Sequence, residues 1–163
     1  HGVDESNPMM TTSEAVPVWE GTPVIKNIYI SDILAKNCLA SAGFIYGLPE
    51  APIEDVVLRH MTLESTLDPE EKGGEPDMVR EERVMAGDGM LFKHVKGLEL
   101  HQVTIETRQG PALLLEHVSD IDVDGLRMRT RHPETPVIRV KETQRLRLPV
   151  TGESAEADYV EYM

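Results

Sequence analysis

The chain has 163 residues, of which 40% are hydrophobic, so it can build one domain with its own core. Acidic residues outnumber basic ones by 29 to 16, and the net charge of −13 argues against binding to nucleic acid phosphates. No window approaches the ~18 apolar residues of a membrane helix. The single cysteine, Cys38, excludes an internal disulfide framework and any cysteine-based metal site.

Residues 1–24 carry no repeating pattern. They include neither an initiating methionine nor a signal peptide, so we expect the chain to come from a longer or a processed gene product. We interpret this segment as an N-terminal arm or cap. Trp19, just before the first repeat, is expected to pack the arm against the rest of the molecule.

Repeats dominate the sequence after this arm. Five segments align without gaps over most of their length, and we call them the first to the fifth unit. Their starts are unevenly spaced, with the longest interval between the second and the third. The segments are Ile25–Ile33, Ile53–Met61, Val95–Val103, Val118–Leu126 and Thr143–Leu148.

Apolar residues recur at fixed offsets from each unit start. Offset three, for example, has Ile28, Val56, Leu98, Ile121 and Leu146. Offsets three, five, eight and ten are apolar, and steps of two are typical of a strand with one buried face. The odd step from five to eight predicts a bend that brings the inward face back into phase. Offset two carries Asn, Asp or Gly in four of the five units, which predicts a turn there.

A second strand precedes most units, as in Ala42–Tyr46 and Gly110–Leu115. The long interval between the second and third units contains a polar insertion, residues 65–83, which we expect to leave the repeat as a loop. The repeats end near residue 150, and residues 151–163 are expected to form an acidic C-terminal tail.

Such a unit cannot bury its own apolar side chains, but stacked units turn each offset into a continuous internal ladder. We therefore predict an all-β fold, a parallel β-helix of about four to five coils over residues 25–150. A leucine-rich repeat lacks support because its asparagine ladder and Leu-x-x-Leu-x-Leu frame are absent. A β-sandwich is disfavoured because no hairpin signal such as Asn-Gly separates the strands.

Two stretches resemble bacterial members of glycoside hydrolase family 28, the polygalacturonase-like enzymes. They are Glu20-Gly-Thr-Pro-Val-Ile-Lys-Asn-Ile-Tyr-Ile30 and the more specific Phe44-Ile-Tyr-Gly-Leu-Pro-Glu-Ala-Pro-Ile-Glu-Asp-Val56. The resemblance covers roughly residues 21–150 and implies a right-handed β-helix. In that family these stretches belong to the later coils.

The resemblance implies hydrolysis of pectic polysaccharide with inversion, which needs one carboxylic acid and one carboxylate. The family supplies these from Asn-Thr-Asp and Asp-Asp motifs, supported by Gly-His-Gly and Arg-Ile-Lys. None of the four is present here, since Val3 does not continue a Gly-His-Gly motif after His1-Gly2 and Val24-Ile25-Lys26 belongs to the first unit. We therefore assign no catalytic residue, and we expect this chain alone to be inactive.

The function expected from the resemblance is that of the C-terminal β-helix portion of such an enzyme, bracing its catalytic coils. The alternative is a non-catalytic β-helix module for binding or assembly. Expected partners are pectic polysaccharide or oligogalacturonide through the complete enzyme, and either the missing N-terminal half or a second copy end to end. The family also implies secretion or a periplasmic location.

Arginines concentrate in residues 127–147, and Arg127 and Arg129 are candidates for binding a polyanion. The simpler interpretation is pairing between ladders, in which Arg129 shares an offset with Glu106 and Arg147 with Glu99 and Asp122. We favour this interpretation. Tyr29 and Tyr46 are candidate sugar-stacking aromatics, in a chain with few aromatic residues.

Two patterns resemble metal sites, but we predict neither a metal site nor a cofactor. Residues 120–125, Asp-Ile-Asp-Val-Asp-Gly, resemble the start of a calcium loop, but Arg131 occupies the position that needs a bidentate acid. Ordinary strand alternation explains this spacing. His94 and His117 both precede a unit start and are expected to stack about 4.8 Å apart. Two imidazoles without a third protein ligand do not make a zinc site.

Overall fold

The computed structural model describes residues 14–68, 70–74, 84–132, 134–147 and 160–163. This part of the chain is all-β and contains no helix. Ten strands form one large sheet, and all of their pairings are parallel. The strands are β1 (Lys26–Ser31), β2 (Leu34–Cys38), β3 (Ser41–Tyr46), β4 (Ile53–Ser65), β5 (Asp88–Thr107), β6 (Leu113–Asp124), β7 (Arg127–Thr130), β8 (Ile138–Lys141), β9 (Gln144–Arg147) and β10 (Val160–Tyr162).

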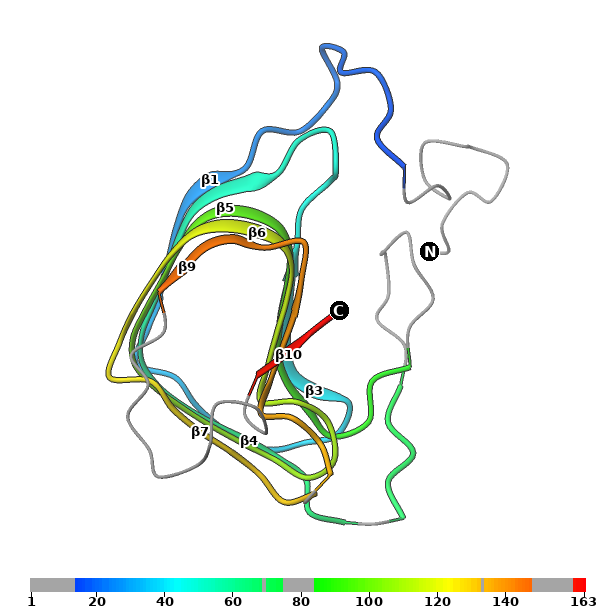
Figure 1. The fold of residues 1–163 in the computed structure, drawn as a ribbon, viewed down its shortest axis with the longest axis vertical. Helices are drawn as coiled ribbons and strands as arrows, with labels where there is room; N and C mark the ends of the chain where they lie inside the picture. The colour runs from blue at the N-terminus through cyan, green and yellow to red at the C-terminus, as the bar shows by residue number, and fades with distance from the viewer. Residues whose placement is uncertain (1–13, 69, 75–83, 133, 148–159) are drawn as a thin grey trace.

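The sheet bends around a central core, an arrangement consistent with a β-helix or solenoid (Figure 1). The pairings define three faces. The first face consists of β1, the starts of the units in β4, β5 and β6, and β9. The second face consists of β2, the end of β4, the end of β5, and β7. The third face consists of β3, the beginnings of β5 and β6, β8 and β10.

The register confirms the alignment of the repeat units. Lys26 pairs with Glu54, Ile53 with Val95, Val95 with Val118, and Ser119 with Gln144, so each unit lies on the next at the same offset. The intervals of different length are absorbed mainly between strands, and the β2–β4 ladder contains one register shift, between Ala35 and Cys38.

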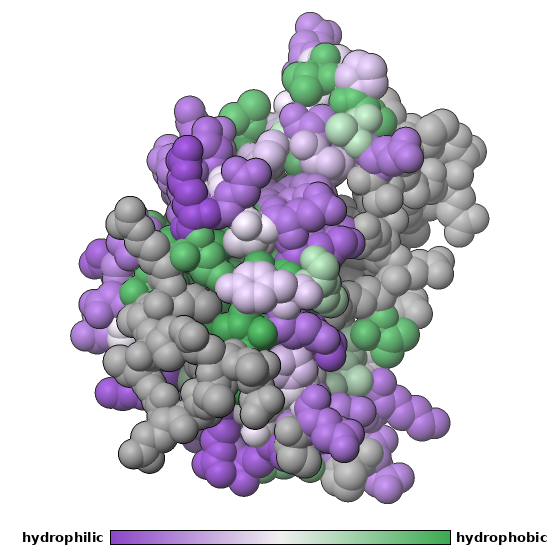
Figure 2. Space-filling view, in the orientation of Figure 1, coloured by the Kyte–Doolittle hydropathy of each residue, from purple (hydrophilic) through white to green (hydrophobic). Residues whose placement is uncertain are grey.

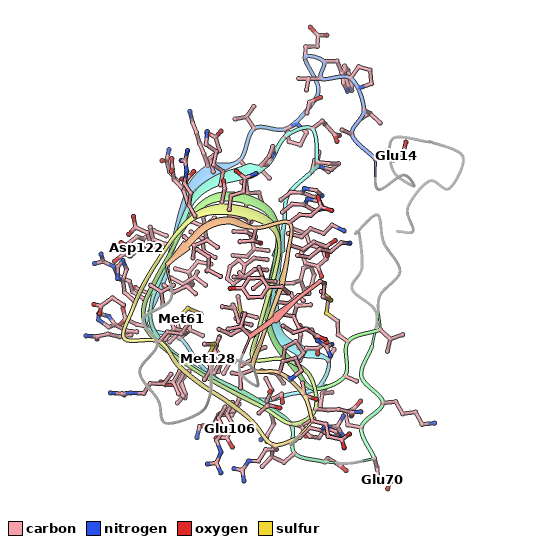
Figure 3. The ribbon with its side chains drawn as sticks, viewed as in Figure 1. Glu14, Met61, Glu70, Glu106, Asp122 and Met128 are labelled. Carbon is pink, nitrogen blue, oxygen red and sulfur yellow. The ribbon has the colours of Figure 1, made fainter. Side chains whose placement is uncertain are left out.

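The core lies inside the three faces and consists of the apolar ladders. Val56, Leu58, Leu98, Leu100 and Phe92 are at most 1% exposed. Figure 3 shows Met61 and Met128 pointing to the inside of the sheet, while Asp122 and Glu106 point away from it. Burying a ladder of Leu, Ile and Val stabilises the fold by about 1.5–3 kcal/mol for each fully buried side chain.

Left-handed backbone conformations produce the bends that the pattern predicts. Offset two has positive φ angles of 56–75° in all five units, and offset seven has φ angles of 51–67° in the first four. A left-handed residue at offset seven brings offsets five and eight onto the same inward side. The residues concerned are Asn27, Asp55, Gly97, Asp120 and Arg145 at offset two, and Asp32, His60, Gln102 and Gly125 at offset seven.

The described end of the insertion, at Gly74, lies on the outside of the third face. Ser65, its first expected residue, closes β4 and is only 3% exposed. Further along, Met85 forms an antiparallel bridge with Gly74 and packs with Leu91 and Leu114 in a small second core outside the sheet. The described parts of the insertion are therefore docked on the sheet.

Two segments outside the repeat pattern also differ from expectation. Val160–Tyr162 form β10, which pairs in parallel with β8, although the tail shows no repeat. Trp19 is 56% exposed and therefore does not pack the arm tightly onto the sheet. Its indole instead covers Gly21, where an added methyl group would lie 2.3 Å from the Trp19 Cη2 atom.

Candidate functional site

The two tyrosines proposed as sugar platforms lie on different faces. Tyr29 is on the outside of β1 and is 61% exposed, with the Arg59 guanidinium 5.7 Å from its ring centroid. Tyr46 ends β3, is half-buried, and its ring lies 5.3 Å from that of Phe44. Tyr46 packs against the small second core, so its contacts are those of a structural residue. The structure does not bring the two rings together into one platform.

Arg127 and Arg129 lie exposed on β7 at the end of the second face. Arg129 is in register with Glu106, as the shared offset predicts, but the ion pair of Glu106 is made by Arg131. The backbone of Arg147 is likewise in register with Asp122. Register therefore identified the neighbouring strands correctly, but it did not identify which arginine contacts Glu106.

Ion pairs between neighbouring units are frequent on the outer surface. The Lys36–Glu64 pair is 3.4 Å long, the Arg139–Glu161 pair 2.7 Å and the Arg145–Asp120 pair 2.6 Å. The hydrogen bond from Arg145 lowers the pKa of Asp120. These contacts are those expected for cross-strand charge ladders, and exposed pairs of this kind contribute about 0–1 kcal/mol each.

Glu116 and its partner Lys93 are the most enclosed members of these ladders, with side chains 15% and 10% exposed. Glu116 lies between Lys93 at 3.6 Å and Lys141 at 3.0 Å, from the strands on either side. Burial raises the pKa of Glu116, but the hydrogen bond from Lys141 and the charges of Lys93, Lys141 and His117 outweigh burial, so the pKa lies below its ordinary value. The arrangement stabilises an ionised carboxylate and fits a structural role.

His94 and His117 stack as predicted, with ring centroids 4.7 Å apart and an interplanar angle of 11°. Glu142, the residue at the same offset in the next unit, places Oε2 3.2 Å from the Nδ1 atom of His117. All three residues have positive φ angles, so this column marks the corner between the third and first faces.

Residues 120–125 behave as a strand. Ile121 and Val123 are 3% and 6% exposed in β6, while Asp122 and Asp124 face outward. Within the described ranges, no group of three or more His, Cys, Asp or Glu side chains is arranged to hold a metal ion. In the same ranges, no helix is long and apolar enough to span a membrane.

One acidic row lies on the outside of the first face, and its Glu99 and Asp122 were considered from the sequence only as partners of Arg147. Glu99 and Asp122 are in register on adjacent strands, and Asp124 is in register with His101. The Nε2 atom of His101 lies 3.0 Å from Oε2 of Glu99. The shared outward offsets could have identified this row. Like charges at adjacent positions destabilise the sheet, and the imidazole of His101 offsets part of this cost by its contact with Glu99.

The clearest candidate for a functional surface is the open end of the sheet at the first unit. Among the described residues, β1 is paired with β4 alone, which leaves its other edge unpaired. Interior residues Ile28 and Ile30 are only half-buried, although the equivalent Leu98 and Leu100 are at most 1% exposed. An unpaired edge beside an incompletely covered core is a template for adding another strand.

Exposed hydrophobic side chains cluster in this same part of the chain. Nine of the large hydrophobic residues that are exposed belong to residues 18–44. They are Val18, Trp19, Val24, Ile25, Tyr29, Ile33, Leu34, Leu39 and Phe44, between 40% and 78% exposed. Figure 2 shows hydrophobic side chains at the upper tip, where Figure 1 places the N-terminal described segment.

Comparison with known proteins identifies no relative. No protein family model, no curated protein and no solved structure matches this chain. The functional assignment therefore depends on the sequence and on the geometry described above.

Proposed function

We propose that this chain is a right-handed parallel β-helix of four to five coils and the C-terminal part of a polygalacturonase-like glycoside hydrolase. Its role is to brace the catalytic coils of that enzyme, which acts on pectic polysaccharide. The catalytic aspartates belong to coils outside this sequence, because none of the four family motifs occurs here. The resemblance of residues 20–30 and 44–56 to family 28 supports the choice of enzyme class.

The observation that carries the bracing role is the open first unit. Ile28 and Ile30 occupy the same ladders as fully buried leucines but remain half-buried. The second edge of β1, which no described residue pairs, can accept a parallel strand. One more coil would extend both ladders and cover the exposed apolar residues. Stacked repeats gain stability from each added neighbour, so the coil and the brace stabilise each other.

A coil-addition experiment tests this role. Residues 95–117 make one complete interval of the repeat, and Val118 and Ile25 are both unit starts, so a copy of 95–117 can replace residues 1–24 in phase. We expect a higher unfolding midpoint and slower hydrogen exchange at β1. The control carries the added segment with its sequence scrambled, which should give neither change. If β1 exchanges as slowly as β5 in a sample of the unaltered chain that sedimentation shows to be monomeric, the end is already closed and the bracing role is wrong.

An activity assay tests the location of catalysis. We expect the purified chain to release no reducing ends from polygalacturonate above a blank, with folding verified by circular dichroism. Release by a sample of the correct intact mass would place catalytic carboxylates within this chain. Glu99 and Asp122 on the first face would then be the first residues to replace by Gln and Asn.

A further inference from the structure

Strand β1, whose second edge has no partner among the described residues, has a nearly symmetric sequence. Reading outward from Tyr29, isoleucine lies on both sides, then Asn27 and Ser31, then Lys26 and Asp32. The polar positions match in character and the outermost residues carry opposite charges. Both Lys26 and Asp32 are exposed.

This symmetry makes the strand complementary to itself in an antiparallel pair. With Tyr29 opposite Tyr29 of a second copy, Ile28 lies opposite Ile30 and both remain on the inner side of the sheet. Lys26 of each copy then lies opposite Asp32 of the other, which gives two equivalent ion pairs across a two-fold axis. A two-fold interface requires this kind of self-complementary surface.

We propose that two copies of this chain associate through the edges of β1, antiparallel and centred on Tyr29. Each copy covers the open end of the other, so the half-buried Ile28 and Ile30 and the exposed Ile33 lose contact with water. Ile33 is 40% exposed in the single chain, and burial of such surface is the main driving force for association. The inference concerns the chain by itself, and a preceding coil would occupy the same edge.

Head-to-tail stacking of copies fits the charges less well. If β1 of one copy continued the ladder beyond β9 of another, Lys26 would lie beside Gln144 and Asn27 beside Arg145 at the shared offsets. At these two described positions no opposite charges meet, and the arrangement would repeat without closure, giving filaments. The antiparallel pair has complementary charges and closes after two copies.

Charge exchange tests the proposed register. Sedimentation equilibrium of the unaltered chain should show a dimer, and Lys26→Glu or Asp32→Lys should each weaken association roughly tenfold, because both symmetric pairs become repulsive. The double variant Lys26→Glu/Asp32→Lys should restore it. The control is Lys96→Glu, since Lys96 has the same offset as Lys26 but its strand is paired on both sides, and it should leave association unchanged.

Cross-linking tests the two-fold axis independently. In a Cys38→Ser background, Tyr29→Cys should give dimers through a disulfide or a short bis-maleimide, because only the residue on the axis meets itself. The control Lys26→Cys should not link to itself.

The outcomes separate this inference from the bracing role. A monomer with protected β1 amides would overturn both proposals. Larger assemblies that ignore the charge exchange would overturn the two-fold pairing and leave the bracing role standing. A dimer restored by the double variant, in a chain that released reducing ends, would support the pairing while contradicting the assignment of catalysis to other coils.

Discussion

The first and third units of the sheet have the same apolar pattern and different burial. Leu98 and Leu100 in the third unit have a neighbouring strand on each side and are at most 1% exposed. Ile28 and Ile30 occupy the same offsets with a neighbour on one side only, and they stay half-buried. Sequence pattern therefore specifies which side chains face inward, whereas the number of stacked neighbours decides how much each contributes to stability.

Replacing equivalent ladder residues of the third and first units by alanine should show the largest difference, which is measured in the free energy of unfolding. We expect Leu98→Ala to lower the free energy of unfolding by about 2–5 kcal/mol, the usual range for a fully buried leucine. Ile28→Ala should cost less than half as much, because water already reaches that position. Urea unfolding in the Lys26→Glu background would compare the two on monomers. Equal costs would mean that another part of the chain covers the first unit.

The docked insertion allows a sharper comparison at the third face. Met85 is 1% exposed and packs on Leu91 and Leu114 from outside the sheet. We expect Met85→Ala to cost about 2 kcal/mol or less, because this small core can open locally without unfolding the ladders. Limited proteolysis between residues 66 and 87 should become faster. The neighbouring Val84 is 62% exposed, and Val84→Ala should change neither measurement.

Acid should weaken the outer charge ladder slightly through Glu116. Because its pKa in the folded chain lies below the ordinary 4.5, the ionised form favours folding above the unfolded-state pKa. This contribution is lost as the pH falls from about 4.5 through the folded value. Because solvent still screens this partly buried group, we expect it to be below about 1 kcal/mol.

Unfolding midpoints from pH 6 to pH 3 should therefore fall less steeply in Glu116→Gln than in the unaltered chain. The matched control is Glu64→Gln, an acid that pairs with one lysine, Lys36, on the neighbouring strand. Its profile should remain parallel to that of the unaltered chain. Identical slopes for all three proteins would show that Glu116 has the same pKa in the folded and unfolded states.

Much of the fold follows from periodicity because the inward ladders repeat without error. The register of Ile53 with Val95 and the stacking of His94 on His117 were both predictable, since residues at one offset must lie on adjacent strands. The sequence predicted a bend between offsets five and eight, but it did not predict that the residue at offset seven adopts a left-handed conformation. Gln102 and His60 are poor indicators of such a conformation, although Asp32 and Gly125 are good ones.

Contacts made outside the ladders were not predictable in the same way. Met85 lies just beyond a polar insertion, and nothing local indicates that it returns to the third face. Glu106 forms its ion pair with Arg131 and not with Arg129, which is in register with it. This pairing depends on how far each side chain reaches, which register does not specify. Strand β10 belongs to a segment without the repeat, so periodicity could not identify it. The family resemblance and the proposed substrate remain predictions, to be tested by the experiments above.

The left-handed corners also bear on how such a chain tolerates changes in length. The intervals between unit starts differ, yet every one of them returns to the same register, so extra residues accumulate between strands and leave the paired segments in phase. A deletion inside a strand would instead turn every following side chain to the opposite side. Insertion and deletion during evolution are therefore confined to the corners, where new surface loops can arise without rebuilding the core.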